Sequence, residues 1–63
     1  MPTRKAGGYK LVIYPNDHPP FHAHNFKDGV LVAKYDFEHG VFMSGDARHF
    51  GRVKEALARV RWI

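Results

Sequence analysis

The chain has 63 residues, with ten lysines and arginines, six aspartates and glutamates, five histidines and no cysteine. A single domain of this length buries only about 60% of the surface of its unfolded chain. The chain is therefore too short for two domains. The lack of cysteine excludes disulfides, thiolate nucleophiles and cysteine-based zinc or iron–sulfur sites, so histidine and carboxylate side chains would have to hold any divalent metal ion.

The net charge and the hydropathy of the sequence limit the classes of partner that the protein can bind. A net charge of +4 favours an anionic partner such as nucleic acid, although a charge of this size also serves solubility in a small domain. The sequence lacks an apolar run near the ~20 residues of a membrane span, and no signal-peptide pattern opens it. We therefore expect a cytoplasmic protein that does not associate with membranes.

In chain order, residues 1–8 carry Arg4, Lys5 and two adjacent glycines, which predicts a flexible basic arm, and residues 9–63 form one α+β domain. Runs rich in β-branched and aromatic residues predict strands at 9–14, 21–26, 30–37 and 41–43. The final segment, 46–62, has helical spacing, with the apolar positions Phe50, Val53, Leu57 and Val60. The prediction is a three- to four-stranded antiparallel sheet in ββββα order, with the C-terminal helix packed on one face.

The loop between the second and third predicted strands decides which side chains face the helix. We predict a three-residue loop at 27–29, with Gly29 in the left-handed conformation. The resulting cross-strand pairs are Phe26–Val30, His24–Val32 and His22–Lys34. A two-residue loop would shift the register by one residue and turn His22 and His24 toward the helix.

With the three-residue loop, the two faces of the sheet differ in polarity. The helix-facing set is Phe21, Ala23, Leu31, Ala33, Tyr35 and Phe37. The other face carries Lys10, Val12, Tyr14, His22, His24, Phe26, Val30, Val32, Lys34 and Asp36. One helix cannot cover both faces, so we expect the apolar residues of the second face to stay exposed, to meet a ligand or to form a homodimer.

Histidine is the unusual feature of the composition. His22 and His24 are two residues apart on a predicted strand, which places both on one face about 7 Å apart at the backbone. Two imidazoles so placed can bind one divalent ion, with a third ligand from Asp17 or His18, or from the more distant Asp36, His39 or His49. The alternatives are exposed strand histidines without a ligand, or histidines that transfer a proton or contact phosphate.

The segment 14–24, YPNDHPPFHAH, resembles the signature of a small bacterial family, domain of unknown function 4160, whose pattern is approximately Y-x-x-D-H-x-P-P-H-F-H-A. The residues that match in order are Asp17, His18, Pro19, Pro20, Phe21, His22 and Ala23. The sequence lacks the residue between His18 and Pro19 and the histidine between Pro20 and Phe21. The family has no established activity. The resemblance implies a gene arrangement like a toxin–antitoxin pair. The missing histidine weakens the argument for a third metal ligand, unless His24 substitutes for it.

Basic residues suggest contacts with an anion or a nucleic acid. Arg48, Arg52 and Arg59 share the outer side of the predicted helix, and Lys10 and Lys34 lie on the helix-free face of the sheet. The alternative is an ordinary solvated surface. Trp62, near the end of the chain, is expected to pack on a sheet edge or on a second subunit.

These observations predict a non-catalytic binding module, one component of a toxin–antitoxin-like pair, that forms a homodimer and binds a protein from a neighbouring gene or a nucleic acid. No catalytic residue and no cofactor is assigned. The alternatives are a small ribonuclease with His22 or His24 as general base, and a module that binds a divalent metal ion through His22 and His24.

Overall fold

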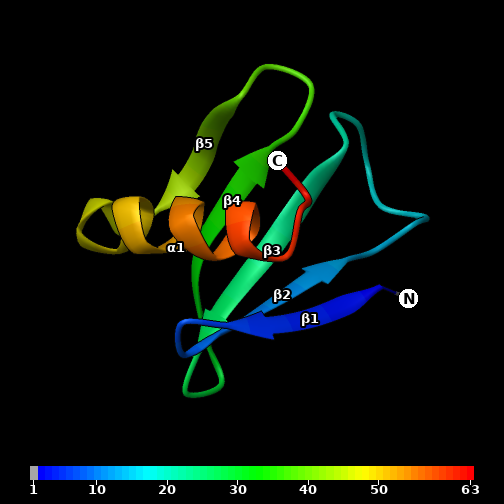
Figure 1. The fold of residues 1–63 in the computed structure, drawn as a ribbon. Helices are drawn as coiled ribbons and strands as arrows, with labels where there is room; N and C mark the ends of the chain where they lie inside the picture. Colours follow the sequence, from blue (N-terminus) through cyan, green and yellow to red (C-terminus); the bar gives the residue numbers. More distant parts are fainter. Residues whose placement is uncertain (1) are drawn as a thin grey trace.

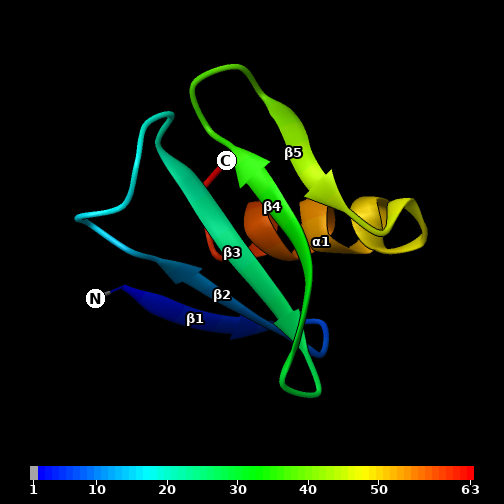
Figure 2. The same cartoon turned by 180° about the vertical axis from the view of Figure 1, so that it is seen from behind.

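The computed structural model of the chain describes residues 2–63. Its elements are β1 (Thr3–Ala6), β2 (Tyr9–Ile13), β3 (His22–Lys27), β4 (Val30–Asp36), β5 (Val41–Gly45) and α1 (Ala47–Arg59). The strands pair antiparallel in sequence order, so β1 and β5 form the two edges of the sheet. Figures 1 and 2 show α1 on one side of this sheet. The predicted α+β class, with one C-terminal helix on an antiparallel sheet, is confirmed.

The sheet has one strand more than the sequence predicts. Thr3–Ala6 pairs with β2 as a fifth strand, where we predicted a flexible arm at residues 1–8. Gly7 and Gly8 both have positive φ angles, 57° and 82°, which is the conformation of a two-residue type I′ hairpin turn. The two adjacent glycines are thus a hairpin signal rather than a sign of disorder. Met1, the first residue of the predicted arm, lies outside the described residues.

The predicted loop at 27–29 is wrong. Asp28 and Gly29 have φ angles of 52° and 78° and form a two-residue turn, so Lys27 pairs with Val30. A β-bulge at Val32 then inserts one extra residue into β4. The observed pairs are Phe26–Leu31, Asn25–Ala33, His24–Lys34, Ala23–Tyr35 and His22–Asp36, in place of the three predicted pairs. The turn and the bulge each shift the register by one residue in the same sense. The total shift is therefore two residues, so His22 and His24 still face away from the helix.

The bulge also moves individual side chains between the faces. Ala23, Ala33 and Tyr35 belong to the buried core as predicted, with Phe37 packed against it. Leu31, predicted under the helix, pairs with Phe26 on the other face and is 43% exposed. Val32, predicted on the helix-free face, packs against the core instead.

Two further assignments to a face are corrected, and a third residue is less exposed than expected. Phe21 precedes β3 and is 52% exposed, because it belongs to the loop and not to a strand. Val30 lies opposite Lys27, whose position alternates with that of Phe26, so Val30 is not on the helix-free face. Val12 is on that face but only 2% exposed, between its cross-strand neighbours Thr3 and His24. Less apolar surface is therefore exposed there than the sequence predicts.

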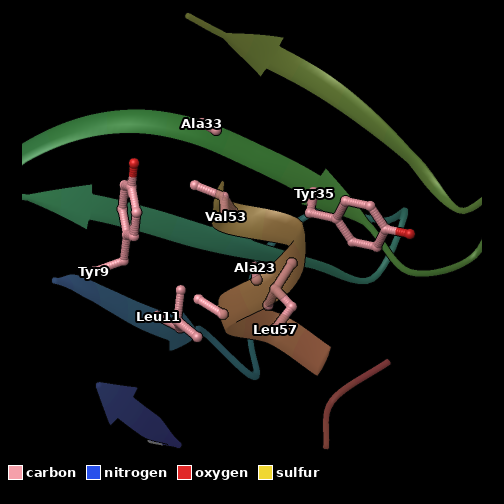
Figure 3. Packing of buried hydrophobic residues seen from close by; sticks show 8 residues of the cluster. Tyr9, Leu11, Ala23, Ala33, Tyr35, Val53 and Leu57 are labelled. Carbon is pink, nitrogen blue, oxygen red and sulfur yellow. The ribbon is translucent and has the colours of Figure 1, made fainter. Parts of the chain in front are cut away.

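The core lies between the sheet and α1. Figure 3 shows Leu11 and Tyr35 on the strands and Val53 and Leu57 on the helix meeting in this layer. The predicted inward positions Phe50 and Val60 pack against the same cluster, and the rings of Phe50 and Phe42 stack 4.1 Å apart. Asn25 is fully buried on the same face of the sheet, a polar residue that the predicted face sets did not place there.

Capping interactions fix both ends of α1. Asp46 is the N-cap residue, and its side chain accepts a hydrogen bond from the backbone N–H of Arg48 at 3.0 Å. At the other end Arg61 adopts a left-handed conformation, and the N–H of Trp62 donates to the carbonyl of Leu57, as in a Schellman motif. The helix therefore ends at Arg59 rather than at the predicted residue 62.

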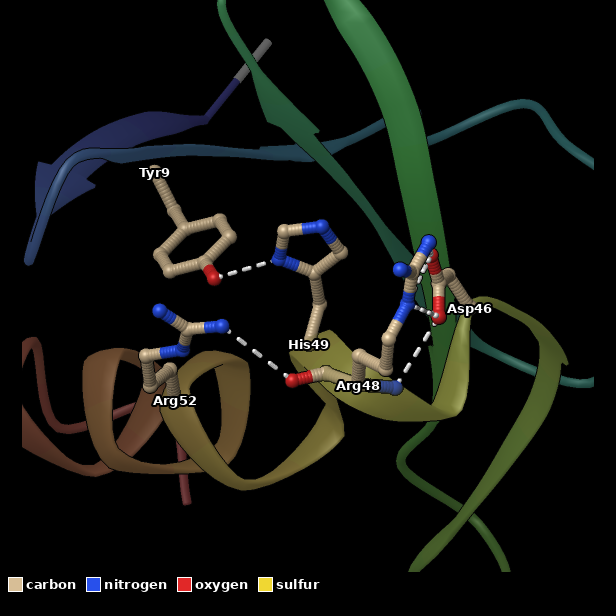
Figure 4. A network of polar contacts seen from close by, with 5 residues as sticks. All are labelled: Tyr9, Asp46, Arg48, His49 and Arg52. Atoms are coloured by element: carbon tan, nitrogen blue, oxygen red, sulfur yellow. Dashed lines mark hydrogen bonds and ion pairs between the residues drawn. The ribbon is translucent and has the colours of Figure 1, made fainter.

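Two aromatic residues connect α1 to the sheet. The Tyr9 hydroxyl lies 2.7 Å from Nδ1 of His49 (Figure 4). Trp62 is half-buried against the core and contacts Phe37, the residue after β4, with their ring centroids 6.5 Å apart. Both contacts join the helical segment to strands far away in the sequence.

Within residues 2–63, α1 is the only helix, and it is neither long nor apolar enough to cross a membrane.

Candidate functional site

The loop between β2 and β3, residues 14–21, brings the predicted motif together. It begins with a turn in which the N–H of Asp17 donates to the carbonyl of Tyr14 at 3.1 Å. The loop includes a cis peptide bond between Pro19 and Pro20. At its end, the N–H of Phe37 donates to the carbonyl of Phe21 at 2.9 Å, and the N–H of Phe21 donates to the Glu38 carboxylate. The loop is thus anchored at both ends before β3 begins.

The protonation of His22 follows from its partner in this loop. Its Nδ1 lies 2.6 Å from the carbonyl oxygen of Pro20. A carbonyl oxygen only accepts, so Nδ1 carries the proton, and the Nε2 atom of a neutral ring has a free lone pair. The hydrogen bond to Pro20 orients the ring and therefore this lone pair, and the side chain is only 6% exposed.

Asp17 lies where the two histidines point. Its Oδ2 atom is 3.2 Å from Nε2 of His22 and 3.6 Å from Nε2 of His24. The other carboxylate oxygen, Oδ1, accepts the backbone N–H of His18 at 2.8 Å. One oxygen of the Asp17 carboxylate thus accepts a backbone hydrogen bond, and the other faces the two histidines.

This arrangement needs a positive charge at its centre. A neutral His22 presents a lone pair to the Asp17 carboxylate at 3.2 Å, and two acceptors at that distance repel each other. Either a second proton on His22 or a bound cation turns this repulsion into attraction.

The charges of Asp17 and His24 are set by their surroundings. The N–H of His18 lowers the pKa of Asp17, which His22 and His24 lower further while partial burial opposes them. Burial lowers the pKa of His24, and the neighbouring His22 and Lys34 add to this while Asp17 opposes it. At neutral pH the site therefore combines an ionised carboxylate with a neutral His24 imidazole, the forms in which both groups bind metal ions.

The spacing of the three donor atoms fits one metal ion. One donor atom from each of Asp17, His22 and His24 lies within 4.8 Å of the others. Ligand atoms of a tetrahedral zinc site, with bonds of about 2.0–2.1 Å, are about 3.3 Å apart. The two measured separations from Asp17 Oδ2 are close to this value. The Nδ1–carbonyl hydrogen bond of His22 is also how proteins commonly orient a metal-binding histidine.

The cluster is open on one side. A hollow of about 660 Å³ is lined by Tyr14, Pro15, Asn16, Asp17 and His24. Tyr14 stands edge-on to the imidazole of His24, with their ring centroids 4.8 Å apart, and thereby supports one wall. The sequence predicts Tyr14 on this face, and the structure adds it to the residues of the site. An ion held by the three side chains has room for water or a ligand on the side of the hollow.

The remaining candidate ligands are elsewhere or already paired. Asp36 accepts the backbone N–H of Glu38 and that of His39, and its Oδ2 is 2.6 Å from Nδ1 of His39. This interaction raises the pKa of His39. His49 is bonded to Tyr9 on the helix side of the sheet. His18 is exposed and contributes its backbone N–H. Of the predicted third ligands, only Asp17 joins the two histidines.

The predicted anion-binding residues do not form one surface. Arg48, Arg52 and Arg59 are exposed on α1, beyond the helix-covered face of the sheet, whereas Lys10 and Lys34 lie on the opposite face. Arg48 is held by Asp46, with 2.8 Å between its Nη2 and the carboxylate (Figure 4). The helix surface is therefore less available to an anion than its arginine count suggests.

Comparisons with models of protein families, with curated proteins and with solved structures find no match to this chain. The resemblance to the family with the D-H-x-P-P-H-F-H-A signature stays a prediction from the residues of segment 14–24.

Proposed function

We propose that the chain is a small metal-binding module, in which Asp17, His22 and His24 hold one divalent ion such as Zn²⁺. The observation that carries this proposal is the convergence of Asp17 Oδ2 and two imidazole Nε2 atoms, one of which has its lone pair fixed by the Pro20 carbonyl. Zinc suits this mixed nitrogen and oxygen donor set.

Three protein ligands leave one position of a tetrahedral zinc ion free. Closed four-ligand sites are typical of structural zinc, whereas three ligands and an exchangeable position are typical of an ion that meets a further molecule. The hollow beside Tyr14 and His24 supplies the space for that molecule. The ion would also tie the 14–21 loop to β3, because Asp17 belongs to the loop and the histidines to the strand.

Titration calorimetry of the purified chain with Zn²⁺ tests the proposal. We expect one ion per chain with a Kd of about 1 μM or tighter, corresponding to about −8 kcal/mol. Asp17→Asn and His24→Gln are expected to weaken binding at least about a hundredfold, because each removes a direct ligand and even outer-shell changes cost about 10- to 100-fold.

His18→Gln is the matched control, because His18 is in the same loop and its side chain is outside the cluster. It is expected to bind Zn²⁺ like the unmodified chain. A Kd near 1 mM, or equal weakening by His18→Gln and His24→Gln, would contradict the proposed site.

The wider role predicted from the sequence, a non-catalytic binding module with a partner protein or nucleic acid, is compatible with this proposal. The homodimer stays a prediction as well, and light scattering coupled to size-exclusion chromatography tests it. Buried Val12 removes part of the apolar surface on which that prediction was based.

A further inference from the structure

The helix-free face of the sheet has a row of residues next to the metal-binding candidates. Cross-strand pairing places Thr3, Val12, His24, Lys34 and Ser44 in one row across all five strands. The adjacent row consists of Lys5, Lys10, Phe26 and Leu31. The two rows are two residues apart along β1, β2 and β3, or about 7 Å, and three residues apart along β4, which contains the bulge. Three lysines thus share this face with His24.

These lysines are not neutralised within the described part of the chain. The ion pairs found among residues 2–63 involve His22, His24, His39 and Arg48, and none involves Lys5, Lys10 or Lys34. Lys5 and Lys10 are both exposed and directly opposite each other on β1 and β2. Like charges in that position repel, so a bound anion would stabilise the pair.

An aromatic ring lies next to the two lysines. Lys5, Lys10 and Phe26 line one hollow of about 270 Å³, to which Asp28 contributes the only carboxylate among the lining residues. Phe26 is half-buried and, among the described residues, has no aromatic neighbour. Lysines beside an available aromatic ring are what proteins use to hold phosphates and stack a base of a single strand.

We propose that this face, defined by Lys5, Lys10, Phe26 and Lys34, binds single-stranded nucleic acid. The lysines contact phosphates and Phe26 stacks on a base. A duplex fits less well, because its bases are stacked on one another and cannot reach a ring set in a hollow. The surface extends through Lys34 to its cross-strand neighbour His24, so a bound strand runs next to the proposed metal site. Binding of the strand does not depend on the ion.

Fluorescence anisotropy with labelled 12-nucleotide single-stranded RNA and DNA, in EDTA, tests this surface separately from metal binding. At 50 mM salt we expect a Kd of about 10⁻⁶ to 10⁻⁴ M. The slope of log K against log salt should be near −2, because three phosphate contacts contribute about −0.7 each. Comparing the Kd values for RNA and DNA shows which of the two nucleic acids the protein prefers.

Variants distinguish binding by this face from attraction by the net positive charge of the protein. Lys5→Gln combined with Lys10→Gln should weaken binding at least about tenfold and reduce the slope by about 1.4. Arg52→Gln combined with Arg59→Gln removes the same charge from the other side of the sheet and should change Kd less than about threefold. Phe26→Ser should weaken binding about five- to 150-fold while Phe26→Tyr keeps it, because the ring is retained. Circular dichroism establishes that each variant is folded.

The proposal is overturned by equal weakening from the lysine and arginine pairs, by duplex binding as tight as single-strand binding, or by a Kd weaker than about 1 mM. Competition by polyglutamate as effective as unlabelled RNA would assign the surface to acidic proteins instead. Zinc binding in calorimetry together with any of these results would leave the metal proposal standing and remove only this one.

Discussion

The hydroxyl of Tyr9, at the start of β2, and Nδ1 of His49, in the first turn of α1, lie 2.7 Å apart and join two elements 40 residues apart in the sequence. Tyr9 is buried, so its hydroxyl exchanges hydrogen bonds with water for this one bond to His49. Tyr9→Phe removes the bond and leaves a ring nitrogen of His49 unsatisfied. We expect the free energy of unfolding to fall by about 1–2 kcal/mol in urea titration.

Tyr14→Phe is the matched control for Tyr9→Phe. Tyr14 is exposed, and its contact with His24 is made by the ring rather than by the hydroxyl. It should change the free energy of unfolding by less than about 0.5 kcal/mol. If both variants lose the same amount, the Tyr9–His49 bond does not stabilise the fold.

Gly45 cannot be replaced without displacing the backbone. Its φ is +126°, and a Cβ atom there would meet the carbonyl oxygen of Val32 and lie 2.5 Å from Cα of Ala33. Gly51, in α1, has nothing within 4 Å of such an atom. Gly45→Ala should cost more than about 3 kcal/mol or prevent folding, whereas Gly51→Ala should stabilise the protein by about 0.5–1 kcal/mol. Thermal unfolding of both variants measures this, and a tolerated Gly45→Ala would show that β5 does not approach β4 this closely.

The N-cap of α1 predicts how stability changes in acid. The Arg48 side chain, and then its backbone N–H, lower the pKa of Asp46 from 3.8 to about 2. A carboxylate whose pKa is lower in the folded state stabilises the fold above the unfolded pKa, and this stabilisation is lost as the pH falls from about 4 to about 2. Asp46→Asn, which still caps a helix, should therefore reduce the loss of stability over this range.

Urea unfolding at pH 7, 4 and 2 measures the effect of Asp46→Asn. Asp28→Asn is the control, because it removes one carboxylate from a turn position whose φ of 52° asparagine also tolerates. The same pH dependence in both variants would show that the Asp46–Arg48 pair contributes nothing particular in acid.

Lys34 influences the titration of His24. The two residues are cross-strand neighbours, and the lysine charge is one of the causes, after burial and His22, that lower the pKa of His24. In the metal-free protein we expect Lys34→Gln to raise the pKa of His24, measured by the NMR chemical shift of its Hε1 proton against pH. Lys54→Gln, on the exposed side of α1, should leave it unchanged. A His24 pKa that is the same in both variants would contradict the influence of the Lys34 charge on this imidazole.

Much of the fold follows from local pattern. The spacing of Phe50, Val53, Leu57 and Val60 identifies α1 and its buried side, and alternation along 22–27 separates Ala23 from His22 and His24. Both are local periodicities, which the sequence displays directly. The strand at Thr3–Ala6 also has a local signal, because Gly7-Gly8 between two short runs indicates a hairpin. The run itself is basic and only weakly apolar, which favours a flexible arm, and the glycine signal outweighs it.

The residue pairs predicted between β3 and β4 are wrong, yet His22 and His24 lie on the predicted face of the sheet. The turn at Asp28 and Gly29 is one residue shorter than predicted, and the bulge at Val32 restores the alternation that this turn alone would have reversed. Which residues of β3 and β4 are paired therefore depends on the turn and the bulge together. The bulge also accommodates a distant contact, since the carbonyl of Val32 accepts the N–H of Asp46 at 2.8 Å.

The sequence by itself determined that no cysteine contributes to a site, that His22 and His24 share a face, and that Asp17 precedes them in a proline-rich loop. Only the tertiary structure decided that Asp17, rather than His18, Asp36, His39 or His49, faces both rings, and that the Pro20 carbonyl fixes the proton of His22. The tertiary structure also pairs Lys5 of β1 with Lys10 of β2. Such meetings depend on loop conformation and cross-strand register, which arise from the whole chain folding at once, whereas the alternation of a strand is a property of its own few residues.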